Sequence, residues 1–184
     1  MTFQERKQAF IALGEFLKGY IHREAIENSQ KDIYSQWDAG IEKASKSNPW
    51  FTHGFILQSF NAISEMLDAA AMERWLGNYT VNDNDHGKTV AVIMAGNIPL
   101  VGFHDFLSVL LSGHKILARM SSDDRHLFPL IKNFLLSYHP DFDKLIEFQE
   151  GTVNGFNAII ATGSDNSSRY FEHYFASYPN IIRK

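Results

Sequence analysis

The chain has 184 residues, 45% of them hydrophobic and 14% aromatic, so it is long enough to bury a core and too apolar to be disordered throughout. Lys and Arg number 17 against 21 Asp and Glu, for a formal net charge of −4. With no block of basic residues, this balance argues against a nucleic-acid partner. The absence of cysteine excludes disulfides, thiolate metal sites and a thiol nucleophile within these residues.

The N-terminal segment has no apolar signal-peptide core, and no window approaches the roughly 18 continuous apolar residues of a membrane span. We therefore expect a cytoplasmic protein without a membrane span. The 8 histidines do not fall at metal-ligand spacings with carboxylates, so no metal site is expected.

Residues 1–80 form a predicted N-terminal helical region. Apolar residues at helical spacing make one stripe that begins at Phe10 and a second that begins at Phe55. The polar run at 81–87 is the only clear linker by composition. We place the domain boundary there, and residues 88–184 form a predicted α/β nucleotide-binding region.

In this second region strand-like runs alternate with helical ones, which predicts an α/β fold with a Rossmann-like, mostly parallel sheet. The third and fourth strands are expected to be joined by a short Gly-bearing loop, and Ile181-Ile182 to open a further element. The expected strands are 89–95, 115–119, 145–149 and 157–162, and the expected helices are 99–112, 123–137 and 165–176.

The segment from Thr89 to Asp124 combines a strand, a polar loop, a helix and a second strand. Pro99 suits a first helical turn, and Gly113 is expected to end the helix in the left-handed conformation. Asn97 follows the carboxyl end of the strand, where open α/β sheets bind ligands. Its carboxamide N–H could stabilise an oxyanion. Alternatively, Asn97 merely tolerates a left-handed turn.

Arg119 ends the second predicted strand, and Ser121 or Ser122 is expected to cap the next helix. A side chain at this place commonly faces the adenosine ribose of a dinucleotide. An acidic residue there binds the 2′-hydroxyl and Arg accommodates a 2′-phosphate, so Arg119 favours NADP as the cofactor. The alternative is an Arg that extends into solvent.

Thr162, Gly163 and Ser164 follow the fourth predicted strand and open a helix, whose free N–H groups suit a pyrophosphate. The alternative is a plain helix cap. No P-loop is present, because Asn82 stands where its first glycine is required. The G-x-G-x-x-G pattern is also missing, so a dinucleotide would be held by a variant geometry.

Two segments together carry a resemblance to a known family, AGNIPLVGFHDFLSVLLSGHKILARMSSDD at 95–124 and NAIIATGSDNSSRYF at 157–171. They resemble the aldehyde dehydrogenase superfamily and, within it, the LuxC-like acyl-CoA reductases. The resemblance implies that an acyl-CoA or acyl-carrier thioester is reduced to an aldehyde with NADPH through a thioacyl-enzyme. Members of the superfamily often dimerise, so a homo-oligomer is a further expectation.

The resemblance also implies roles for individual residues. Asn97 matches the family's oxyanion-hole Asn, and Arg119 matches the basic residue near the adenosine ribose, although Lys is usual there. Thr162, Gly163 and Ser164 match the loop near the cofactor pyrophosphate.

Ser122 stands near the place where NAD-preferring relatives often carry Glu, which again favours NADP. The chief departure is the nucleophile, because the family attacks its substrate with a cysteine from the C-terminal half and this chain has none. We therefore expect these residues to be the N-terminal half of a longer enzyme, inactive alone. The alternative is a non-catalytic α/β interaction or assembly module that kept the fold.

Overall fold

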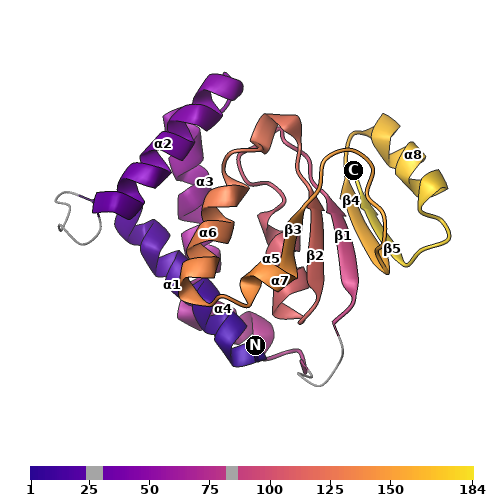
Figure 1. Ribbon diagram of the computed structural model, residues 1–184, viewed down its shortest axis with the longest axis horizontal. Coiled ribbons are helices and arrows are strands. Elements are labelled where there is room, and N and C mark those ends of the chain that lie inside the picture. The colour runs from indigo at the N-terminus through magenta and orange to yellow at the C-terminus, as the bar shows by residue number, and fades with distance from the viewer. Residues whose placement is uncertain (24–30, 82–86) are drawn as a thin grey trace.

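The computed structural model describes residues 1–23, 31–81 and 87–184. At its centre lies a five-stranded parallel sheet with the strand order β3-β2-β1-β4-β5 (Figure 1). The strands are β1 Thr89–Ile93, β2 Lys115–Arg119, β3 Ile146–Phe148, β4 Ala158–Thr162 and β5 Asn180–Arg183. The predicted α/β class, the parallel sheet and the preceding helices are confirmed, and the element expected at Ile181-Ile182 is a fifth strand.

Within the described residues, four α-helices precede the sheet: α1 Phe3–Ile21, α2 Lys31–Ser47, α3 His53–Met66 and α4 Ala69–Leu76. Helix α1 begins with a capping box, in which the Thr2 hydroxyl accepts the Glu5 N–H and the Glu5 carboxylate accepts the Thr2 N–H. Residues 24–30 of the predicted helical region lie outside the described residues. Phe55, which we expected to begin the second apolar stripe, is 55% exposed, because the buried face of α3 begins at Ile56.

The two faces of the sheet are covered by different parts of the chain (Figure 1). Val90 and Val92 point into a large core formed with α1, α3, α5 Phe103–Leu111 and α6 Phe128–Tyr138. Ala91 and Ile93, which alternate with them, join a smaller cluster with α8 Asp165–Tyr174. Burial on both faces explains why the strands are continuously apolar.

The order in which strands are added to the sheet reverses between β3 and β4, although all the strand pairs are parallel. Residues 149–157 make this connection without a helix and pass over the α8 face, where Val153 is buried in the smaller cluster. Gly151 and Gly155 adopt positive φ angles of 74° and 77°, which favour glycine, so the predicted Gly-bearing loop is confirmed. Strand β4 consequently pairs with β1, on the side away from β2. Open α/β sheets bind ligands beside such a reversal, at the carboxyl ends of the strands.

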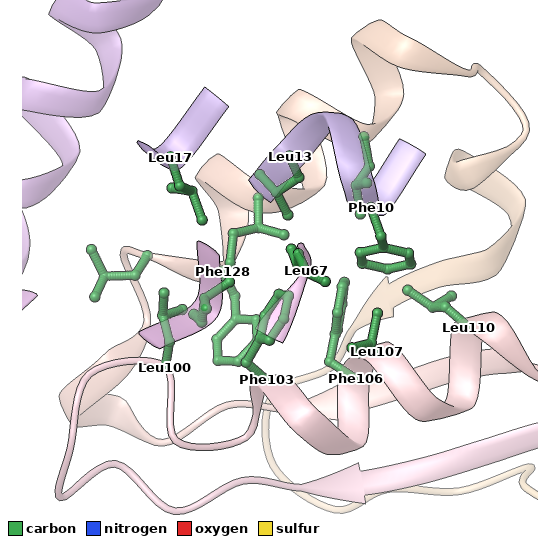
Figure 2. Close-up of a cluster of buried hydrophobic side chains, with 14 of the residues drawn as sticks. Phe10, Leu13, Leu17, Leu67, Leu100, Phe103, Phe106, Leu107, Leu110 and Phe128 are labelled. Carbon is green, nitrogen blue, oxygen red and sulfur yellow. The ribbon is translucent and has the colours of Figure 1, made fainter. Parts of the chain in front are cut away.

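The helical region and the α/β region share one core (Figure 2). Phe10 of α1 makes edge-to-face contacts with Phe103 and Phe106 of α5 and with Phe142 of α7 Phe142–Leu145. Arg6 of α1 also donates to the Leu111 carbonyl at the end of α5 (3.4 Å). Helix α1 is therefore packed directly on the helices that cover the sheet.

Two predicted helices begin later than expected. Helix α5 begins at Phe103 and not at 99, because Leu100 adopts a φ of 57° and interrupts the helical path. The helix expected from 123 consists of the short 3₁₀ helix η2, Ser122–Asp124, followed by α6. The predicted left-handed Gly113 is confirmed, with a φ of 83°.

Candidate functional site

A cavity of about 720 Å³ lies at the carboxyl ends of β1, β2, β3 and β4. It occupies the place where the strand order reverses, as expected for a ligand site in an open α/β sheet. The structure brings six of the seven sequence-predicted site residues together around it: Arg119, Ser121, Ser122, Thr162, Gly163 and Ser164.

The turn after β2 forms one wall of the cavity. Ser121 caps η2, since its hydroxyl accepts the Asp123 N–H (3.3 Å), so of the two alternatives for the predicted cap it is Ser121 and not Ser122. The loop after β1 lies directly against this turn: a Cβ at Gly96 would come within 2.4 Å of the Ser121 Cβ. Gly96 is therefore required for the close approach of the two loops.

Two arginines, Arg119 and Arg125, line the cavity. Within the described part of the chain the Arg119 guanidinium has neither a hydrogen bond nor an ion pair, and the Arg125 guanidinium donates only to the Ser122 carbonyl (3.1 Å). Glu150 also lines the cavity. Two guanidinium groups without a carboxylate partner are suited to an anionic ligand.

The turn between β4 and α8 forms the opposite wall. A Cβ at Gly163 would lie 2.8 Å from the Ser167 Cβ and 3.0 Å from a ring carbon of Phe171, so glycine lets this turn lie close to α8. Ser164 caps α8 by accepting the Ser167 N–H (3.4 Å). Ser164 is thus a helix cap, as the alternative interpretation of this turn expected. The N-terminus of α8 that it caps carries a helix dipole that favours an anion.

Asn97, the seventh predicted residue, does not line this cavity. It lies in the loop after β1, and its side chain is exposed and forms no hydrogen bond with any other described residue. Its backbone neighbours Met94 and Ala95 do line the cavity. The Asn97 carboxamide is therefore free to contact a molecule beside the cavity and not one held within it.

Asp124 is a buried carboxylate that the sequence did not single out. It is 2% exposed, and its Oδ2 accepts the backbone N–H of Leu100 (2.6 Å), the residue in the left-handed conformation. Its other oxygen has no partner among the described residues. Burial raises the pKa of Asp124 to about 7, and the Leu100 hydrogen bond opposes this change. For a residue with a Cβ, the left-handed conformation of Leu100 costs on the order of 1 kcal/mol.

The sequence also missed Arg125 and the residues after β3 that complete the cavity. Arg125 follows the capping Ser121 by one turn, a signal that could have placed it at the same edge. Gln149 and Glu150 carried no such signal. They reach the cavity because β3 pairs with β2, and this long-range pairing cannot be seen in the local sequence.

Neither a metal centre nor a membrane helix is found in the described ranges 1–23, 31–81 and 87–184. No three His, Asp or Glu side chains there are grouped so that they could hold a metal ion. Of the helices in these ranges, none is both long and apolar enough to cross a membrane.

No protein-family model and no curated protein sequence matches the chain, but solved structures do. A NAD-dependent benzaldehyde dehydrogenase from Corynebacterium glutamicum matches 99% of the chain with a TM-score of 0.64 and 14% identity. A putative aldehyde dehydrogenase, PutA, from Anabaena variabilis matches 98% with a TM-score of 0.55 and 18% identity. The glyceraldehyde-3-phosphate dehydrogenase GapN from Methanocaldococcus jannaschii, solved with NADP, matches 99% with a TM-score of 0.56 and 14% identity.

These matches show that the chain has the fold of part of an aldehyde dehydrogenase. The chain spans 41%, 42% and 46% of the three matched proteins, which is less than half of each. Sequence identities of 14–18% show the fold alone and do not transfer an activity or a substrate.

Proposed function

We propose that this chain is the N-terminal, cofactor-binding part of a cytoplasmic acyl-CoA reductase that uses NADPH to reduce an acyl thioester to an aldehyde. The observation that supports this best is the cavity at the carboxyl edge of an aldehyde dehydrogenase-like sheet, lined by Arg119, Ser121 and Gly163. The cysteine that forms the thioacyl-enzyme is not among these residues, so it must be supplied from outside them.

The residues around the cavity fit a phosphorylated dinucleotide. Arg119 and Arg125 would hold the phosphate on the adenosine ribose, and the turn at 162–164 would hold the pyrophosphate against the N-terminus of α8. When bound, NADPH supplies the hydride that reduces the acyl group. The protein's own contribution is to orient the cofactor and to exclude water around it.

The proposed role of Asn97 is to donate its carboxamide N–H to the thioester oxygen as negative charge develops there. Its exposure beside the cavity, and not within it, suits contact with a substrate that lies next to the cofactor. Donors of this kind contribute about 3–4 kcal/mol of transition-state stabilisation.

The direct test is titration calorimetry of the folded chain with NADPH. We expect saturable binding, and the full-length gene product should bind NADPH as well. Absence of binding to both proteins, each shown to be folded by circular dichroism, would contradict the proposal and favour the non-catalytic interaction or assembly module.

The choice between cofactors is expected to depend on Arg125. Replacing it with alanine should weaken NADPH binding at least about tenfold and change NADH binding less than about twofold, because a charge-assisted contact to a phosphate is worth about 1.5–3 kcal/mol. Calorimetry with both cofactors measures the change. Arg169→Ala, on the exposed surface of α8, removes the same charge outside the cavity and should change neither affinity. Equal weakening of NADPH and NADH binding by Arg125→Ala would contradict a phosphate contact.

The oxyanion role of Asn97 predicts a selective loss of turnover. In the full-length gene product, Asn97→Ala should lower kcat by about a hundredfold or more and leave NADPH affinity within about twofold. Asn133→Ala, at an exposed position on α6, is the matched control and should leave kcat unchanged. Losses of similar size in kcat and in NADPH affinity would indicate that Asn97 supports the cofactor instead.

A further inference from the structure

The loop after β1 contacts the segment after β2 at two places. The backbone of Gly96 lies so close to Ser121 that no Cβ fits between them. Four residues later, the Leu100 N–H donates to Asp124 Oδ2 at 2.6 Å. Both contacts are made to the segment that also carries cavity-lining residues.

Asn97 lies between these two contacts. Leu100 is held from both sides, since its side chain is buried in the core shown in Figure 2 and its N–H is held by Asp124. Because only two residues separate Asn97 from Leu100, the path of the backbone at Leu100 limits where the Asn97 side chain can lie. A left-handed Leu persists only where its surroundings determine it, and Asp124 is the polar part of those surroundings.

We propose that Asp124 is a positioning residue for Asn97, which it sets relative to the cavity by holding the backbone of Leu100. This inference rests on the proposed role of Asn97 and extends it to the buried carboxylate. Asp124 is buried and does not line the cavity, so its proposed effect on Asn97 is indirect. It connects the segment that lines the cavity to the loop that carries Asn97. We therefore expect a ligand that contacts one of these segments to change the position of the other.

The test compares Asp124→Ala, which removes the acceptor, with Asp124→Asn, which keeps an oxygen at the same place. Amide hydrogen exchange measured by NMR should be at least about tenfold faster at Leu100 in the alanine variant, relative to the amides of β1 and β2 in the same protein. The side-chain amide resonances of Asn97 should shift in the alanine variant as well. In the asparagine variant the exchange rate of the Leu100 amide and the resonances of the Asn97 side chain should stay close to those of the wild-type chain.

Asp123→Ala is the matched control, because it removes the neighbouring carboxylate, which is exposed, and should alter neither signal. Titration with NADPH then tests whether a ligand in the cavity affects the loop that carries Asn97. The Asn97 resonances should shift on NADPH addition in the wild-type and Asp124→Asn proteins but not in Asp124→Ala. If Leu100 exchange in Asp124→Ala, relative to β1 and β2, stays within about twofold of wild type, the positioning role is wrong. The exchange result needs no cofactor, so it separates failure of this inference from failure of NADPH binding.

Discussion

Replacing Phe10 with alanine is expected to lower the free energy of unfolding by about 3–5 kcal/mol. The ring is fully buried, and Figure 2 shows it beside Phe103 and Phe106. Its edge contacts to Phe103, Phe106 and Phe142 have centroid distances of 6.3, 6.4 and 6.1 Å. Alanine would leave a cavity at the junction of α1, α5 and α7. The neighbouring side chains are close-packed, so they can move to fill only part of it. Denaturant unfolding followed by circular dichroism measures the change.

Because this junction joins the helical region to the α/β region, we expect the loss to appear in one cooperative transition of the whole chain. Phe55→Ala removes the same side chain from the exposed surface of α3 and should cost less than about 1 kcal/mol. Two separate transitions, with only one of them shifted by Phe10→Ala, would instead support independent domains at 1–80 and 88–184.

The second large effect is a dependence of stability on pH that comes from Asp124. Burial raises the pKa of this carboxyl from 3.8 to about 7 in the folded chain. Between about pH 4 and pH 7 the folded chain therefore holds a proton that the unfolded chain has released. Each pKa unit is worth about 1.4 kcal/mol, so the contribution of Asp124 falls by up to about 4 kcal/mol as the pH rises through this window.

Asp124→Asn cannot titrate, so its stability should fall less than that of the wild-type chain over the same window, and it should be the more stable protein above pH 7. Unfolding curves near pH 4 and pH 8 measure the difference. Hydrogen bonds from Lys46 and Lys144 lower the pKa of Glu42 and Asp141, which adds stability that is lost as the pH falls, but both proteins share these groups. Parallel pH profiles for the two proteins would show that Asp124 is not the responsible group.

Local sequence signals predicted much of the candidate cavity. The polar residues that follow β2 and β4 were identifiable because each comes directly after a buried strand and opens a helical turn. Parallel strands bring such turns to one edge, so Arg119, Ser121 and Gly163 could be grouped before any contact was known. The same reasoning placed Asn97 at this edge, and the structure adds that its side chain lies outside the cavity.

The fold class, the strand positions and the Gly113 helix end were determined by the sequence alone, because they depend on apolar runs and on the conformational freedom of single residues. The tertiary structure decided the strand order, the passage of 149–157 over the α8 face and the packing of α1 on α5. It also decided the late start of α5, because the left-handed Leu100 is held by Asp124, 24 residues away in sequence. These features depend on contacts between distant segments, and no local propensity encodes which segments will meet.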